Sequence, residues 1–144
     1  MFDELTKYKH NDQFFFDGIK KLSEVCNAPT DKSGVYIIYK LAKGKIELIY
    51  IGSSGKENKD GTIKTRKAGL GGLKDRLANG KQFGDRRRIT FPIVMKLPLI
   101  EALDIYWYLT FDNLHKDIPK TVEIMLLEKF HSIYGRLLEC NSEF

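Results

Sequence analysis

Four side chains in this sequence carry functional groups that can act on a phosphate: the phenols of Tyr36 and Tyr50, the guanidinium of Arg76 and the carboxylate of Glu123. Hydrolysis of a phosphodiester needs an activated water, positive charge beside the phosphate and stabilisation of the leaving oxygen. A tyrosine can accept a proton when nearby cations lower its pKa from about 10. An arginine fork matches phosphoryl oxygens better than a lysine does. A carboxylate can hold Mg²⁺ or Mn²⁺, because both ions prefer oxygen ligands.

The position of Glu123 in its helix singles it out among the acids. Residues 121–134 follow Pro119, have helical periodicity and end at Gly135. At about 100° per residue, Glu123 falls inside the apolar arc, whereas Glu128 falls on the opposite side. A carboxylate on a core-facing stripe is costly unless something pairs with it. A divalent metal ion is one such partner, and an arginine or tyrosine at the rim of the arc is the alternative.

The remaining patterns predict an α/β chain of the α+β type, with a small antiparallel three-stranded sheet flanked by helices. Residues 35–39 and 46–51 form a strand hairpin, residues 103–111 a third strand, and residues 73–78 a short helix. Apolar residues at positions 14, 15, 16, 19 and 22 predict an amphipathic helix. We therefore expect an N-terminal helical extension over residues 1–32 and one main domain over residues 33–144.

Two tripeptides of the hairpin resemble the signature of the GIY-YIG nuclease superfamily: Gly34-Val35-Tyr36 and Tyr50-Ile51-Gly52. The stretch 73–77 is similar to the arginine helix of that family, and 123–130 to its glutamate helix. Asn141 is similar to the asparagine that closes the core of its compact restriction and homing members. The resemblance implies a metal-dependent DNA endonuclease in which Glu123 holds the metal. The implied catalytic residues are Tyr36, Tyr50, Arg76, Glu123 and Asn141.

The sequence departs from the family pattern at two positions, which leaves a second function open. Many members carry a lysine where this chain has Ser53, and a histidine or tyrosine where it has Gly80. The alternative is a GIY-YIG-like module that binds nucleic acid without turnover. For the two tyrosines, the alternative to catalysis is aromatic packing across the hairpin.

Positive charge is concentrated in the middle of the chain. Residues 53–88 contain eleven basic and four acidic residues, whereas the whole chain has a net charge of +5. Such a block indicates a polyanionic partner, here double-stranded DNA, and a soluble loop face is the alternative. We expect residues 53–72 to form a long loop and the three arginines at 86–88 to precede an extended segment. The candidate DNA-binding residues are Lys56, Lys64, Arg66, Lys67, Lys74, Lys81, Arg86, Arg87 and Arg88.

The composition suits one globular domain of 144 residues. No apolar run reaches the about 20 residues of a membrane helix, so we expect a cytoplasmic protein with no membrane contact. Cys26 and Cys140 are isolated and are expected to be reduced thiols. His10, His115 and His131 form no ligand cluster at usable spacing. Because one compact active site cuts one strand, double-strand cleavage would need a homodimer or two successive nicks.

Overall fold

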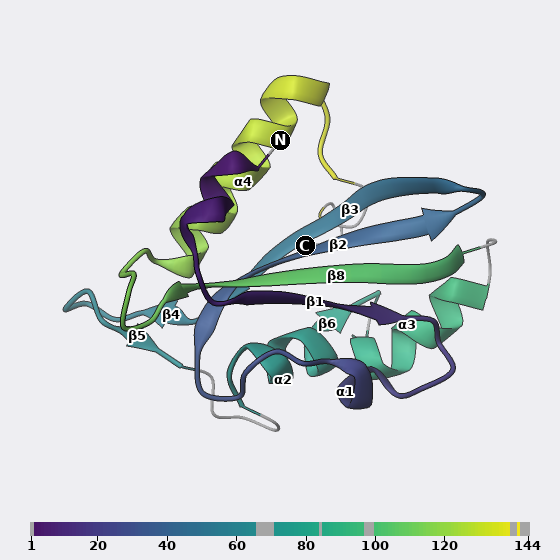
Figure 1. Cartoon of the computed structure of the whole chain (residues 1–144), viewed down its shortest axis with the longest axis horizontal. Helices are drawn as coiled ribbons and strands as arrows, with labels where there is room; N and C mark the ends of the chain where they lie inside the picture. Colours follow the sequence, from purple (N-terminus) through teal and green to yellow (C-terminus); the bar gives the residue numbers. More distant parts are fainter. Residues whose placement is uncertain (1, 66–70, 84, 97–99, 139–140, 142–144) are drawn as a thin grey trace.

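The core of the protein is a four-stranded antiparallel sheet with strand order β1-β8-β2-β3 (Figure 1). The computed structural model describes residues 2–65, 71–83, 85–96, 100–138 and 141. The central strands are β2 (Ser33–Ala42) and β8 (Ile100–Phe111), and the edges are β1 (Asn11–Phe16) and β3 (Lys45–Ser54). The α/β class and the antiparallel sheet are therefore confirmed, but the sheet has four strands instead of the predicted three.

The hairpin of β2 and β3 forms as predicted, and its turn has a clear local cause. Lys43 and Gly44 both have positive φ, 52° and 72°. Two successive residues with positive φ match the right-handed twist of the flanking strands. The register pairs Tyr36 with Gly52 and Ile38 with Tyr50, and it shifts between Ile38 and Tyr39. The two signature tripeptides therefore lie on adjacent strands.

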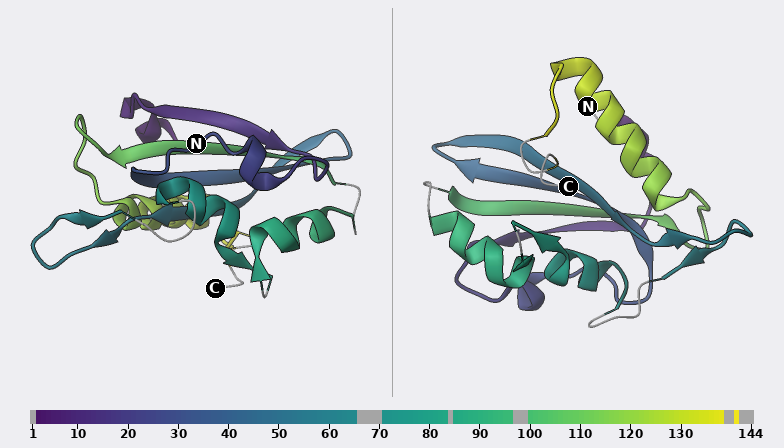
Figure 2. Two further views of the ribbon diagram at one scale, coloured as in Figure 1. Left: turned by 90° about the horizontal axis from the view of Figure 1, so that it is seen from below. Right: turned by 180° about the vertical axis from the view of Figure 1, so that it is seen from behind.

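Helices cover the two faces of the sheet separately, as the views in Figures 1 and 2 show. On one face lie α1 (Leu22–Val25), α2 (Gly72–Asn79) and α3 (Arg87–Lys96). On the other lie α4 (Pro119–Tyr134) and the 3-10 helix η1 (Asp3–Lys7). Two small hairpins complete the described chain: β4 (Lys56–Glu57) with β5 (Ile63–Lys64), and β6 (Lys81–Gln82) with β7 (Asp85–Arg86). Each face of the sheet has its own hydrophobic cluster.

The N-terminal segment corrects the sequence interpretation. Residues 11–16 form edge strand β1 along β8 rather than part of a helix. Phe14 and Phe16 are buried while Phe15 is 53% exposed, which is the period of two of a strand. Three phenylalanines in succession fit a helix or a strand, and pairing with the twelve-residue strand β8 decides between them. Residues 11–16 thus belong to the main sheet, and the described residues 2–32 are not a helical extension.

Two more expectations about the basic segment were wrong. Instead of an irregular loop from residue 53, β3 continues to Ser54 and the β4–β5 hairpin follows. The segment after the arginine run is helix α3, although Pro92 lies inside it. Buried Arg87, Phe91 and Met95 recur every four residues. That spacing forms one face of a helix and outweighs the helix-breaking tendency of the proline.

Helix α4 agrees with the sequence analysis in its bounds and in the orientation of its acids. Pro119 stands at its first turn, and Gly135 ends it in the left-handed conformation with φ of 67°. Glu123 is 8% exposed, whereas Glu128 is exposed. No helix in the described part of the chain is both long and apolar enough to cross a membrane.

The N-terminal residues are tied to the rest of the protein by Asp117. Its Oδ2 accepts a hydrogen bond from the Tyr8 hydroxyl at 2.6 Å and lies 3.1 Å from Lys7 Nζ. The Tyr8 hydrogen bond and the nearby Lys7 lower the pKa of Asp117, although burial opposes them. A lowered folded-state pKa stabilises the fold above the unfolded value and loses that contribution as pH falls through the folded value.

We therefore expect the Asp117→Asn variant to be less stable than wild type near neutral pH and to lose less stability in acid. Urea unfolding between about pH 6 and pH 2 measures this. Asp31→Asn, at an exposed aspartate, is the matched control and should keep the wild-type pH dependence. An unchanged acid limb in Asp117→Asn would contradict the assignment.

Candidate active site

Tyr36 and Tyr50 lie side by side on the sheet face that α2 and α3 cover. Their ring centroids are 5.8 Å apart, with an interplanar angle of 31°. The Tyr36 ring lies directly over Gly52, because a Cβ there would come within 2.5 Å of its Cζ and hydroxyl oxygen. Only glycine at position 52 allows this close approach. The two tripeptides therefore depend on each other sterically.

Arg87 holds the two tyrosine rings from the side of α3. Its Cζ lies 5.1 Å from the Tyr36 centroid and 4.9 Å from the Tyr50 centroid, and the residue is 1% exposed. Its Nε donates to Gln82 Oε1 at 2.9 Å, and its Nη1 donates to the Arg76 carbonyl at 2.8 Å. This burial is inconsistent with the predicted contact between Arg87 and a DNA backbone. The sequence alone did not separate it from its exposed neighbours Arg86 and Arg88.

Arg87 explains why this chain has Gly80 where many GIY-YIG nucleases have a histidine or tyrosine. A Cβ at position 80 would meet the Arg76 carbonyl oxygen at 2.3 Å and Arg87 Nη1 at 2.7 Å. The Gly80 N–H also caps α2 by donating to the Arg76 carbonyl at 3.0 Å. The space after the arginine helix is thus occupied by a guanidinium from α3.

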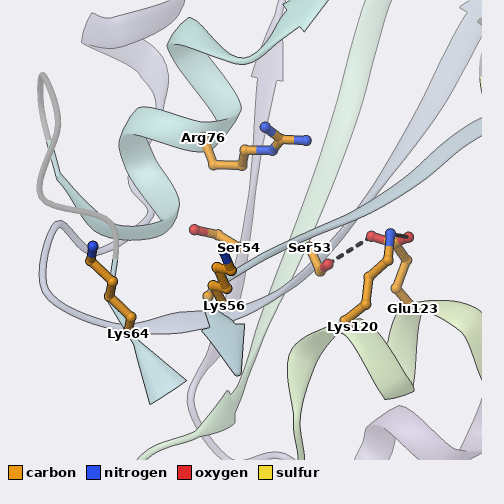
Figure 3. Close-up of a pocket in the computed structure, with 8 residues that line it drawn as sticks. Ser53, Ser54, Lys56, Lys64, Arg76, Lys120 and Glu123 are labelled. Carbon is orange, nitrogen blue, oxygen red and sulfur yellow. Dashed lines mark hydrogen bonds and ion pairs between the residues drawn. The ribbon is translucent and has the colours of Figure 1, made fainter. Parts of the chain in front are cut away.

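Arg76, Glu123 and the end of β3 meet at one pocket of about 340 Å³ (Figure 3). Arg76 reaches it from α2, and Glu123 from the first turns of α4. Four cations and one carboxylate line it, which gives the pocket an excess of three positive charges. The lining residues are Ser53, Ser54, Gly55, Lys56, Lys64, Arg76, Lys120 and Glu123.

The Glu123 carboxylate has two partners at the pocket. Ser53 Oγ donates to its Oε1 at 2.7 Å, and Lys120 Nζ lies 2.7 Å from its Oε2. The residue that replaces the usual lysine of the family, Ser53, therefore contacts the predicted metal ligand directly. Lys120 was missed in the sequence analysis. Its signal was the i,i+3 spacing to Glu123, which places both side chains on one helix face.

Ser54 Oγ, which lines this pocket, is buried and has no hydrogen-bond partner among the described residues. The buried Tyr36 hydroxyl lies close to Tyr50 and Arg76, and its hydrogen bonding and charge raise the pKa of both. Burying a polar group without a partner costs free energy, and such groups in folded proteins often face a ligand or water. Ser54 Oγ therefore has spare capacity for a ligand in the pocket, whereas Tyr36 is 0% exposed and is not among the lining residues.

The electrostatics of the tyrosines and Arg76 are linked. Burial and the neighbouring Tyr36 raise the pKa of Tyr50 above its usual value, although Arg87 and Arg76 oppose this. Tyr50 therefore keeps its proton at neutral pH and is a hydrogen-bond donor. Burial alone would lower the pKa of Arg76, but Tyr36, Tyr50 and Glu123 raise it more. Arg76 stays charged in the site.

The other predicted basic residues divide into separate groups. Lys56 and Lys64 line the pocket, whereas Lys74 is half-buried and acts electrostatically on the Cys26 thiol. Lys81, Arg86 and Arg88 are exposed, and Arg88 lines a different hollow beside α1. The predictions for Arg66 and Lys67, and for the Cys140 thiol, lie outside the described residues.

The side chain of Asn141 binds the backbone of β3. Its Nδ2 donates to the Ile51 carbonyl at 2.8 Å, and its Oδ1 accepts from the Ile51 N–H at 3.0 Å. Both bonds satisfy backbone groups on the outer edge of β3, next to Tyr50 and Gly52. Like Tyr36 and Tyr50, Asn141 is not among the residues that line the pocket. Its amide supports the strand that carries Tyr50.

We expect Arg87→Ala to lower the free energy of unfolding by about 2 kcal/mol or more, because it leaves a cavity and removes the partner of buried Gln82. Arg88→Ala, the same change at an exposed neighbour, should change stability by less than about 0.5 kcal/mol. Chemical unfolding measures both. Equal effects in the two variants would contradict the supporting role of Arg87.

Comparisons of the chain with family models, curated proteins and solved structures find no match. The resemblance to GIY-YIG nucleases therefore rests on residues of this chain alone. Those residues are the tyrosine pair over Gly52, Arg76 on the short helix α2, and buried Glu123 on α4.

Proposed function

We propose that the chain is a metal-dependent endonuclease that hydrolyses phosphodiester bonds in DNA, with a GIY-YIG type of active site. The observation that carries the proposal is the pocket that Arg76 and the buried carboxylate of Glu123 line together, with Tyr36 and Tyr50 close enough to Arg76 to raise its pKa. These are the groups that phosphate binding and water attack require.

Substrate binding is supported by charge. Lys56, Lys64, Lys120 and Arg76 all line the pocket with a single acid, Glu123. The side chain of Lys120 is 65% exposed and can leave Glu123 for a phosphate oxygen. Contacts of this kind fix the DNA backbone in position without reading its sequence.

The residues present fit a magnesium or manganese ion. Among the described residues there is no group of three or more His, Cys, Asp or Glu side chains that could form an all-protein metal cage. Mg²⁺ does not need one, because it is often bound by one or two carboxylates together with water and substrate phosphate. Glu123 would hold the ion, and the neighbouring Ser53 hydroxyl is close enough to orient its carboxylate. When bound, the ion neutralises charge on the phosphate and on the leaving oxygen.

The side chains divide the remaining work of hydrolysis. Water attacks phosphorus, the bond from phosphorus to the leaving 3′-oxygen breaks, and one proton moves from the water to the leaving group through protein or solvent. Arg76 donates hydrogen bonds to the phosphoryl oxygens as charge develops there. Tyr50 keeps its proton and acts as a donor. We assign the orientation of the attacking water to Tyr36, which lies beside it on the hairpin.

A second function, nucleic-acid binding without turnover, is favoured by the Lys120–Glu123 ion pair. The ammonium group of Lys120 lies on the carboxylate oxygen that a metal ion would need. In such a module the cations of the pocket hold a phosphate, and Glu123 only positions Lys120. Cleavage and binding experiments separate the two functions.

We expect magnesium-dependent nicking of supercoiled plasmid by the wild-type chain. Glu123→Ala should lower the rate by about a hundredfold or more, because it removes the metal ligand. Glu128→Ala, the same change on the exposed side of α4, should keep the wild-type rate. Gel shift with the same DNA is measured in parallel.

The outcomes are distinct. Equal nicking by wild type and Glu123→Ala indicates a contaminating nuclease and contradicts the proposal. Binding by both without nicking by either supports the module. If the wild-type protein neither binds nor nicks DNA, both functions are contradicted.

The salt dependence of DNA binding tests the pocket lysines. Each phosphate contact changes the slope of log K against log salt concentration by about 0.9. We expect Lys56→Ala together with Lys64→Ala to make the slope shallower by about 2. The control pair is Lys43→Ala with Lys45→Ala, at exposed positions on the β2–β3 turn, and it should leave the slope unchanged. A shallower slope in the control alone would place DNA at the hairpin turn instead.

A further inference from the structure

A second hollow lies on the sheet face that α4 covers, toward the turn of the β2–β3 hairpin. Its volume is about 170 Å³, and its walls are three tyrosine rings, one isoleucine and one carboxylate. Tyr39 comes from β2 and Ile46 from β3, while Asp104, Tyr106 and Tyr108 come from β8. Tyr39 and Asp104 are paired across the strands. This cluster shares no residue with the pocket of Arg76 and Glu123.

The carboxylate of Asp104 lacks a positive partner. The residue is 8% exposed, and its Oδ1 has no hydrogen-bond partner among the described residues. None of the ion pairs between described residues includes Asp104. Burial raises the pKa of Asp104, although a hydrogen bond that the Tyr106 hydroxyl donates to its carboxylate opposes this. The hydrogen bond leaves the negative charge without a cation. A carboxylate in this situation gains stability when a cation comes close to it.

The tyrosine rings around Asp104 are not parallel to one another. Tyr39 and Tyr106 meet edge to face, with centroids 5.6 Å apart and an interplanar angle of 82°. The faces of aromatic rings are negative and attract cations, most strongly when the cation is poorly hydrated. All three tyrosines are half-buried, so each leaves part of its surface open to the hollow.

We propose that Tyr39, Tyr106, Tyr108 and Asp104 form a binding site for a methylated ammonium group, such as the trimethylammonium group of a small organic cation. The rings contact the methyl groups, and the carboxylate of Asp104 balances the charge. The volume fits, because about 170 Å³ holds five or six groups of the size of a water molecule, each about 30 Å³. A trimethylammonium group with its attached carbon has five such groups.

The residues that line this hollow disfavour phosphate, the ligand proposed for the pocket of Arg76 and Glu123. A phosphate there would approach the Asp104 carboxylate, and no lysine or arginine of the described residues lines the hollow to balance its charge. A metal ion is also disfavoured, since Asp104 is the only carboxylate among the described lining residues. Burial raises the pKa of the three tyrosines, which therefore keep their protons and are weak metal ligands. An organic cation satisfies both the carboxylate and the rings.

Titration of the full chain with choline chloride at constant ionic strength tests the proposal. Isothermal calorimetry, or chemical shifts of the tyrosine rings, should show saturable binding in the millimolar range. The uncharged analogue 3,3-dimethyl-1-butanol has the same shape and should bind at least about threefold more weakly, because it lacks the cation–π and carboxylate terms. Free Nε-trimethyllysine is the third ligand. Tighter binding of choline than of trimethyllysine indicates a small soluble cation, and the reverse order indicates a methylated lysine side chain.

Variants locate the binding. Asp104→Asn and Tyr106→Leu should each weaken choline binding by about three- to thirtyfold. Tyr134→Leu, the same aromatic-to-aliphatic change at a half-exposed position on α4, should have no effect on choline. Thermal unfolding of each variant shows whether it is folded.

Three results would overturn the proposal. They are the absence of saturation by choline, equal binding of the uncharged analogue, and unchanged affinity in folded Asp104→Asn and Tyr106→Leu. If neither variant folds, the comparison of choline with its uncharged analogue on the wild-type chain still decides. None of these measurements depends on DNA cleavage.

Discussion

The close contact between the Tyr36 ring and the bare backbone of Gly52 is the constraint on which the rest of the candidate site depends. It fixes the register of β2 and β3, because any other pairing would place a side chain under the ring. It also brings the Tyr50 ring to within 5.8 Å of the Tyr36 ring, and the guanidinium of Arg87 lies over both rings. Arg87 in turn binds the last turn of α2 through the Arg76 carbonyl. One steric contact thus connects the hairpin, α3 and the helix that carries Arg76.

Charge in the site is arranged by depth. The deep cation, Arg87, is enclosed by aromatic rings and an amide, and it holds the structure together. The outer cations, Arg76, Lys56, Lys64 and Lys120, surround the open pocket and can reach a ligand. The contacts of the buried Arg87 are shielded from dissolved salt, because aromatic faces and fixed hydrogen bonds replace the water around its guanidinium. The outer cations are available for binding and are screened by salt.

The sequence predicted the parts of the fold and site that depend on local patterns. The hairpin follows from β-branched residues around a Lys43–Gly44 turn, and the burial of Glu123 follows from helix periodicity. Strand β1 was not predictable, because Phe14, Phe15 and Phe16 fit two periods and only their pairing with β8 decides. Arg87 was not distinguishable from Arg86 and Arg88, because its burial also depends on residues that are distant in the sequence. Its role comes from Tyr36 and Tyr50, which lie more than thirty positions earlier in the chain.

The amide of Asn141 has a consequence for how the molecule behaves among its own copies. Strand β3 is an outer edge of the sheet, and its free backbone groups could pair with a strand from another molecule. With one donor and one acceptor, this side chain imitates a single residue of an additional strand at Ile51. A strand from another molecule would have to displace this amide before it could pair with β3 at Ile51. One polar side chain thus covers an exposed edge at one residue without adding a strand.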